Sequence, residues 1–264
     1  MVQQVKITRL DVSTGKSQKI VDYIAEEKPL YLLINTTFWA TILCSPTNHK
    51  ELAVGHFLSE GIIKSIEEIE EVIFKQQEST CYVKLKPEIE VKNRVNTSRL
   101  HARIIHSACG DSSDYQNSAK NLKIKSELKV KAQIIFDSVK QLNFKAEGYR
   151  LTGGFHVAAI YKTDGKLVAL AEDVGRHNAV DKVIGMAALN NVDFGECFLA
   201  LSGRISGDVA FKAANVGLPI IASLSAALSS GITMAESVDL TMAGFVRGKR
   251  INIYTCPERI VSKI

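Results

Sequence analysis

The strongest constraint on the fold is the order of elements that residues 127–264 predict. Apolar runs of strand length alternate there with stretches of helical spacing, separated by turn-forming residues. The expected helices are Leu128–Val139, His177–Leu189, Asp208–Asn215 and Thr233–Val238; the expected strands are Phe155–Tyr161, Leu167–Glu172, Cys197–Leu201, Ile220–Leu224 and a final Met242–Val246. This order implies the α/β class, with a mixed or mostly parallel sheet covered by helices on both faces.

The first 105 residues predict a smaller α+β portion. We expect strands at Val5–Arg9, Tyr31–Asn35, Trp39–Cys44, Glu67–Phe74 and Cys81–Leu85, and a helix that follows Asn48 and stops at Gly61. Residues 106–126 are polar and lack periodicity, which favours an exposed, mobile loop. We therefore divide the chain into an N-terminal α+β portion (1–105), a cysteine loop (106–126) and an α/β domain (127–264).

Composition and charge exclude several classes of protein. No apolar run reaches the length of a membrane helix, and Met1–Asp11 lacks the features of a secretory signal, so we expect a cytoplasmic protein without a membrane partner. The net charge of +5 is spread along the chain, without an arginine-rich run, so we expect no nucleic-acid partner. The Cys and His residues form no compact ligand set, so we expect no metal site.

Cys109 is the one cysteine outside an apolar or strand-like context. Its neighbours are small and polar, and His106 favours the thiolate, so the sulfur is a candidate nucleophile. The alternative is an exposed loop cysteine without a role. Cys44, Cys81 and Cys197 lie in strand-like runs and are expected in the core, whereas the context of Cys256 decides nothing.

Three loops combine glycine, hydroxyl and basic side chains: Leu151–His156, Glu172–Asn178 and Leu201–Gly207. Ligands of open α/β sheets bind where strands hand over to helices, and these residue types suit phosphate or pyrophosphate. One such loop alone is equally well a helix cap with a surface charge, but three in succession favour a site. The candidate residues are His156, Arg176, His177, Ser202 and Arg204; His156 could instead be a core residue on a strand.

These segments, taken in order, resemble the formate dehydrogenase accessory sulfurtransferase family (FdhD). The resemblance extends from about residue 26 to residue 259, and its most specific piece is Glu172–Lys182. Further matching segments are Glu27–Leu30 with Asn35, Leu52–Ile63, Ser107–Gly110, Thr152–His156, Ser202–Arg204, Gly244–Gly248 and Tyr254–Arg259.

The resemblance implies a function. A cysteine desulfurase passes sulfur to the loop cysteine, here Cys109, which holds it as a persulfide. The sulfur then reaches the molybdenum bis(molybdopterin guanine dinucleotide) cofactor, bound as a substrate, before this enters formate dehydrogenase. A guanine nucleotide is the expected mimic of this substrate, and a homodimer is the expected assembly.

The resemblance also implies a cytidine-deaminase-like α/β fold and a substrate-binding segment. That segment consists of Phe245, Val246, Arg247, Gly248, Lys249 and Arg250, although Phe245 and Val246 could simply form a core strand. The zinc-binding turns of that fold would correspond to Val174–Asn178 and Ser202–Gly207, without the zinc cysteines. A deaminase-like hydrolase is therefore disfavoured.

One position departs from the family pattern. The family loop commonly carries a second cysteine where this chain has Ser112, so no internal resolving thiol exists. Either Cys109 suffices alone, or the protein is a non-catalytic chaperone that binds the cofactor.

Overall fold

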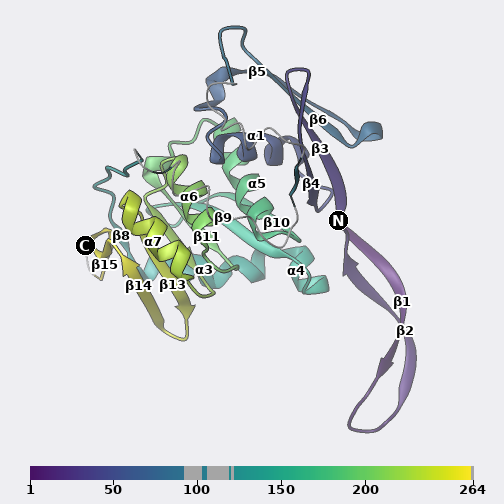
Figure 1. Ribbon diagram of the computed structural model, residues 1–264. Coiled ribbons are helices and arrows are strands. Elements are labelled where there is room, and N and C mark those ends of the chain that lie inside the picture. The colour runs from purple at the N-terminus through teal and green to yellow at the C-terminus, as the bar shows by residue number, and fades with distance from the viewer. Residues whose placement is uncertain (92–102, 106–118, 120–121, 263–264) are drawn as a thin grey trace.

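The computed structural model describes residues 1–91, 103–105, 119 and 122–262. Within these ranges the chain forms a two-stranded N-terminal arm, a five-stranded sheet, a six-stranded sheet and a short strand pair near the C-terminus (Figure 1). One hydrophobic core is continuous between the two larger sheets, since its main cluster contains both Leu32 and Leu199. The domain division at residues 105 and 127 stays a prediction.

The N-terminal part is built from hairpins. β1 (Val2–Leu10) and β2 (Ser17–Ala25) form the arm, and the chain continues from it into β3 (Lys28–Ile34) and β4 (Thr37–Cys44). β5 (Ile69–Lys75), β6 (Thr80–Leu85) and β7 (Arg103–Ile105) complete a sheet of order β5-β6-β3-β4-β7. Alternation sends Leu30, Leu32 and Ile34 into the core and leaves Tyr31 on the outer face.

The larger sheet has the order β10-β9-β11-β12-β13-β14. β11, β12 and β13 run parallel, whereas the remaining neighbours pair antiparallel, so the predicted mixed sheet is confirmed. Its strands are β9 (His156–Lys162), β10 (Leu167–Asp173), β11 (Cys197–Leu201), β12 (Ile220–Ser223), β13 (Thr241–Arg247) and β14 (Arg250–Thr255).

Helices cover both faces of this sheet. On one face α3 (Ala132–Lys145) buries Ile135 and Val139 against inward residues such as Val157 of β9. On the other face lie α5 (Arg176–Leu189), α6 (Gly207–Asn215) and α7 (Ser229–Val238). α1 (His49–Ser59), from the N-terminal part of the chain, packs beside them. Because successive strand residues point to opposite faces, Val157 faces α3 while Ala158 joins the other cluster.

α1 and α5 cross at very short distance. A Cβ added to Gly55 of α1 would lie 1.7 Å from the carbonyl oxygen of Asp181, and one added to Gly185 of α5 would lie 1.9 Å from the carbonyl oxygen of Glu51. Both positions therefore require glycine. This crossing joins the N-terminal part to the helix that begins with Arg176.

Several sequence predictions need correction, and α7 (Ser229–Val238) also begins before the expected Thr233. The helix expected at Leu128–Val139 begins only at Ala132 and runs to Lys145, because Val130–Lys131 forms a short strand (β8) paired with β15 (Ile260–Val261). Met242–Val246 is not the final strand, since β14 and β15 follow it. The short helix α4 (Glu147–Thr152) had no counterpart in the sequence prediction, because its six residues are too few to show helical periodicity.

The predicted core cysteines are confirmed. Cys44, Cys81 and Cys197 are buried, and Cys256 is half-buried; all four have free thiols. Across the described ranges, no helix combines the length and apolar character that crossing a membrane requires.

Candidate functional site

The candidate residues from the α/β domain converge at one edge of the six-stranded sheet. β10, β11, β12 and β13 all end there, and β9 begins there, because β9 runs antiparallel to both of its neighbours. This edge carries His156, the turn that precedes α5, the loop 202–206, the loop 224–228 and the β13–β14 turn. The convergence expected from the strand order is therefore present.

Several side chains of the run Glu172–Lys182 serve as scaffold. The Asp173 carboxylate accepts hydrogen bonds from the backbone N–H groups of Ser45 (3.0 Å) and Gly175 (2.9 Å) and from the Asn178 amide (2.9 Å). It also lies 2.7 Å from Lys182 Nζ, and both side chains are fully buried. A buried ion pair with satisfied hydrogen bonds fixes the end of β10 against the end of β4.

A second member of this run caps a helix. The Glu172 carboxylate accepts hydrogen bonds from the backbone N–H groups of Gly148 (3.1 Å) and Tyr149 (2.6 Å), at the start of α4. A carboxylate satisfies N–H groups that lack partners at a helix start and opposes the helix dipole. Sequence reasoning assigned Glu172 to a ligand-binding loop and missed this role.

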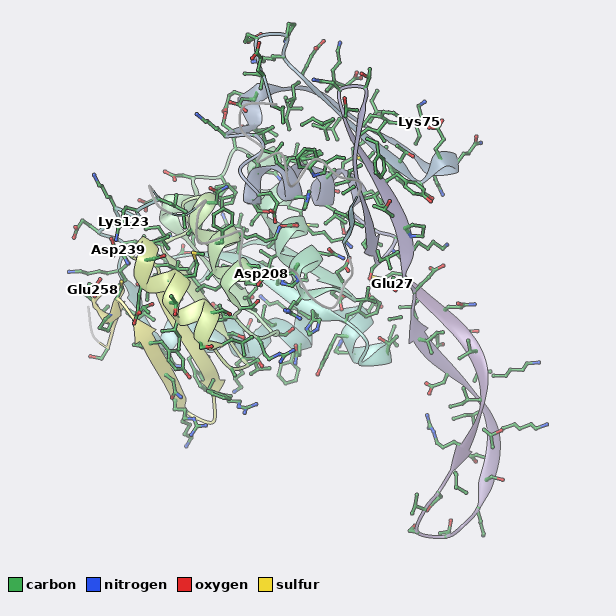
Figure 2. The ribbon with its side chains drawn as sticks, in the orientation of Figure 1. Glu27, Lys75, Lys123, Asp208, Asp239 and Glu258 are labelled. Atoms are coloured by element: carbon green, nitrogen blue, oxygen red, sulfur yellow. The ribbon has the colours of Figure 1, made fainter. Side chains whose placement is uncertain are left out.

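His177 and Asp208 form a buried pair between α5 and α6. His177 Nε2 lies 2.6 Å from Asp208 Oδ2, and Asp208, which is labelled in Figure 2, is buried. The other oxygen of Asp208 accepts hydrogen bonds from the Ser206 hydroxyl and from Val209 N–H (2.8 Å). Burial opposes ionisation, but these contacts outweigh it and hold the pKa of Asp208 well below its usual range.

The loops 202–206 and 224–228 are joined by hydrogen bonds. Ser223 Oγ donates to the carbonyl of Gly203 (2.6 Å), and Ile205 N–H donates to the carbonyl of Ala226 (3.0 Å). Ser202 extends the sheet, because its Oγ accepts from Val157 N–H at 2.9 Å. The loops 202–206 and 224–228 therefore form one continuous surface, and Ser202 contributes to its framework.

Gly203 is surrounded by basic side chains. A Cβ at this position would lie 3.1 Å from Cβ of Arg176 and 3.3 Å from Nδ1 of His156. Burial, followed by the positive charges of Arg176, His177 and Arg204, lowers the pKa of His156. The guanidinium groups of Arg176 and Arg204 give this part of the sheet edge a positive potential that suits an anion.

The β13–β14 turn presents the remaining candidates. Gly248 (φ 59°) and Lys249 (φ 65°) both have positive φ, as a two-residue hairpin turn of type I′ requires. Arg247, Lys249 and Arg250 are exposed at its tip. Val246, by contrast, is buried beneath α3, so only its backbone is free to reach a ligand.

Phe245 has an unusual backbone conformation. Its φ is 49°, which is rare for a bulky residue, and it lies in a bulge where Phe245 and Val246 interrupt the pairing of β13 with β14. Its N–H donates to the carbonyl of Ser225 (2.8 Å), which links the bulge to the loop 224–228. The guanidinium carbons of Arg247 and Arg250 lie 5.1 Å and 5.9 Å from its ring centroid. Such a half-buried ring is a suitable platform for stacking a base.

Several residues of the site were not candidates from the sequence. Asp208 and Ser206 orient His177, and Ser223 and Ser225 position the loops around Gly203 and Phe245. Ser206 directly precedes α6, where a serine is typical of capping, so the sequence offered no signal for its contact with Asp208. Cys109, Ser112 and most of the loop 106–126 lie outside the described residues.

Comparisons with a family model and with known proteins identify the same family. The model of the FdhD/NarQ family matches residues 25–261. The "Sulfur carrier protein FdhD" of Saccharolobus solfataricus is 37% identical over 266 residues, covering 97% of this chain and 99% of the relative. The protein of the same name from Staphylococcus aureus (strain MRSA252) is 34% identical over 251 residues, covering 94% of this chain and 92% of the relative.

A solved structure shares the fold. A crystal structure described as that of a formate dehydrogenase accessory protein from Desulfotalea psychrophila matches with a TM-score of 0.80 at 23% identity, covering 98% of this chain and 99% of that chain.

Proposed function

The chain belongs to the FdhD/NarQ family, and from this premise we propose that it is a sulfur carrier that serves formate dehydrogenase. The names of the relatives and of the structural match support this role. The finer proposal is a sulfurtransferase that takes sulfur from a cysteine desulfurase and passes it to the molybdenum bis(molybdopterin guanine dinucleotide) cofactor. Formate dehydrogenase is the client that receives the sulfurated cofactor.

We assign the sulfur-carrying role to Cys109, and the burial of the other thiols is the observation that carries this assignment. Burial raises the pKa of Cys44 and of Cys81 to about 12 and that of Cys197 to about 11, so these thiols stay protonated and shielded near neutral pH. Burial also raises the pKa of Cys256. Of the five cysteines, this leaves Cys109 as the candidate nucleophile.

The loading step is a thiol exchange. The Cys109 thiolate attacks the terminal sulfur of a persulfide on the desulfurase, so a new S–S bond forms as the donor's S–S bond breaks. The electron pair of the broken bond leaves on the donor cysteine as its thiolate. Cys109 then holds the transferred sulfur as a persulfide.

Delivery requires two electrons, because the transferred sulfur is reduced to sulfide. A second loop cysteine would supply them by forming a disulfide, but this chain has Ser112 at that position. In our proposal the electrons come from the acceptor metal or from an external thiol.

The sheet edge suits the anionic, guanine-bearing cofactor. The carboxylate of Asp208 pairs with His177, and that of Asp173 pairs with Lys182, so the charges of both carboxylates are offset. The guanidinium groups at the sheet edge give this edge a positive potential. We propose that Arg176, Arg204 and the cations of the β13–β14 turn bind the pyrophosphates. The Phe245 ring would stack on a guanine, and neutral His156 would donate or accept one hydrogen bond.

Ser112 favours one alternative function. Without a second loop thiol, the protein could bind the cofactor and deliver it without transferring sulfur. This chaperone role uses the same sheet edge and does not require Cys109. Sulfur loading therefore separates the two functions.

The test is intact-protein mass spectrometry after incubation with a cysteine desulfurase and cysteine. We expect the wild type to gain the mass of one sulfur atom, Cys109→Ala to gain none, and the matched control Cys256→Ala to behave as the wild type. No gain in the wild type, with a desulfurase shown to be active, would favour the chaperone.

Cofactor binding is tested separately by titration with guanosine diphosphate as the mimic. Arg204→Ala is expected to weaken binding about tenfold, the effect of losing one charge-assisted phosphate contact, whereas the exposed Arg9→Ala in the arm should leave it unchanged. We further propose that two copies assemble and that the protein acts in the cytoplasm, where free thiols persist.

A further inference from the structure

The two ring nitrogens of His177 have different surroundings. Nε2 is enclosed by the protein and lies 2.6 Å from Asp208 Oδ2. Nδ1 has no hydrogen-bond partner among the described residues, and it does not belong to the enclosed polar atoms. One nitrogen of the ring therefore faces Asp208, and the other is free to contact a ligand.

The Asp208 carboxylate can act only as an acceptor toward His177. Its other oxygen, Oδ1, accepts hydrogen bonds from the Ser206 hydroxyl and from Val209 N–H, which fix the orientation of the side chain. Burial opposes the ionisation of Asp208, but its contacts outweigh burial and hold its pKa well below the usual range. Because an ionised carboxylate offers no proton, the proton between the two side chains belongs to Nε2.

This assignment decides what a change of charge does to the ring. In the neutral ring Nε2 carries the only proton, so Nδ1 is an acceptor; in the charged ring Nδ1 becomes a donor. A phosphate oxygen accepts hydrogen bonds, so it is repelled by the lone pair of the neutral ring and attracted by the N–H group of the charged one. The bond of a phosphate to His177 therefore requires a second proton.

Several charged and titratable groups surround this ring: Asp208 on α6, Arg176 on α5, His156 at the start of β9, Arg204 in the loop 202–206 and Asp173 at the end of β10. The charge of Asp173 is offset by Lys182. Arg176 and the positive end of the α5 dipole favour the neutral form of His177, whereas the adjacent Asp208 carboxylate favours the charged form.

His156 does not share this titration. Burial, followed by the positive charges around it, lowers the pKa of His156, so its ring stays neutral near neutral pH. His177 is then the histidine of this edge whose charge a bound anion can change.

We propose that Asp208 is a positioning residue that fixes a proton on Nε2 of His177 and acts as its counter-ion, so that His177 gains a proton on Nδ1 when it binds a phosphate group of the substrate. This inference rests on the proposed function of the sheet edge and adds a regulation to it. Binding of the pyrophosphate is coupled to the uptake of one proton, and the affinity rises as the pH falls.

Asp208→Asn tests this role, because the neighbours of Asp208 decide how an amide would lie. The Ser206 hydroxyl and Val209 N–H both donate to Oδ1, so the amide oxygen occupies that position and the NH₂ group faces His177. Nε2 must then accept a hydrogen bond, and the proton of the neutral ring moves to Nδ1. The variant exchanges the tautomer of His177 with little change in the shape of its partner.

The first experiment is ¹⁵N NMR of the six histidine rings, with His177 assigned by the signal that His177→Gln removes. At pH 8 we expect the proton on Nε2 in the wild type and on Nδ1 in Asp208→Asn. The matched control is Asp193→Asn, at an exposed aspartate that accepts from Gly195 N–H at the opposite edge of the sheet, and it should match the wild type. A wild-type ring with its proton on Nδ1 would overturn the proposal, even if Asp208→Asn did not fold.

The second experiment is calorimetric titration with guanosine diphosphate at pH 6.5 and at pH 8. We expect the wild type and Asp193→Asn to bind at least about fivefold more tightly at pH 6.5, the gain from one charge-assisted contact. Asp208→Asn should lose most of this difference. Protonation of the nucleotide itself is common to all three proteins, so the comparison isolates His177. An equal pH dependence in the wild type and Asp208→Asn would overturn the proposal.

Failure of this inference differs from failure of the proposed function. Guanosine diphosphate that does not bind the wild type at either pH would overturn both the cofactor site and the role of Asp208. Binding with the same pH dependence in Asp208→Asn would overturn the role of Asp208 alone, and sulfur loading of Cys109 is measured separately by mass. Retained circular dichroism and melting temperature in the variants exclude unfolding as the cause.

Discussion

The crossing of α1 and α5 supports a quantitative prediction for Gly185→Ala. In a helix interior, replacing glycine by alanine normally stabilises by about 1 kcal/mol. Here the new Cβ would lie 1.9 Å from the carbonyl oxygen of Glu51, where real contacts are essentially never shorter than 3.0 Å. The two helices must therefore separate by about 1 Å at this point.

That separation would break a buried polar network between the same helices. Ser59 Oγ of α1 donates to Asp181 Oδ1 of α5 at 2.7 Å, and His56 Nδ1 lies 3.3 Å from Asp181 Oδ2. Stretched by about 1 Å, both contacts leave hydrogen-bonding range. Hydrogen bonds to a charged group contribute about 1.5–3 kcal/mol each.

The expected net effect is a large loss of stability. Two broken bonds cost about 3 kcal/mol or more, overpacking adds about 2 kcal/mol, and the helix preference of alanine returns about 1 kcal/mol. We expect Gly185→Ala to lower the free energy of unfolding by about 4 kcal/mol and the melting temperature by about 10 °C.

Urea unfolding followed by the fluorescence of Trp39 measures this effect. The matched control is Gly195→Ala, whose added Cβ would meet only the Asp193 side chain, at 3.2 Å, and whose stability should change by less than about 1 kcal/mol. Gly55→Ala strains the same crossing from the other helix, so the double variant should cost less than the sum of the two. A Gly185→Ala protein as stable as the wild type would refute this reasoning.

Three further predictions follow from the described residues. Native protein treated with iodoacetamide near neutral pH should remain unlabelled at Cys44, Cys81 and Cys197, because burial raises their pKa to 11 or above; peptide mapping that finds any of them alkylated before unfolding would contradict this. Phe245→Ala should weaken guanosine diphosphate binding at least about fivefold, the loss expected for one stacked base, and calorimetry that shows unchanged affinity would count against the stacking role. The third prediction concerns Asp181. Burial opposes its ionisation, but Lys212 and His56 lower its pKa to about 2. The ionised carboxylate therefore adds about 2 kcal/mol to the free energy of unfolding above pH 4, and this contribution is lost as the pH falls through 2. Asp181→Asn should accordingly be closer to wild-type stability at pH 2 than at pH 6, whereas a difference independent of pH would exclude this linkage.

Patterns of short range in the sequence determined much of the fold. The alternation of apolar runs predicted β9, β10, β11, β12 and β13 and the helices between them, because side-chain periodicity reports which face of an element is buried. The sequence also predicted that Cys44, Cys81 and Cys197 lie in the core. The order of strands further implied that the glycine-rich loops meet at one sheet edge. The first two conclusions depend on neighbouring residues alone, and the third depends on the order of the elements.

The roles of individual residues within that edge depended on the tertiary structure. Asp173 and Lys182 lie in the run Glu172–Lys182 that carries the resemblance, and only the structure shows that they form a fully buried pair that holds the end of β4. The bulge gives Phe245 its positive φ through a bond to Ser225, twenty positions earlier. Likewise, only the packing of α1 on α5 shows why Gly55 and Gly185 must be glycine. Sequence patterns record burial along one element, whereas the partner of a buried charge or the clearance beside a glycine is set by elements distant in the chain.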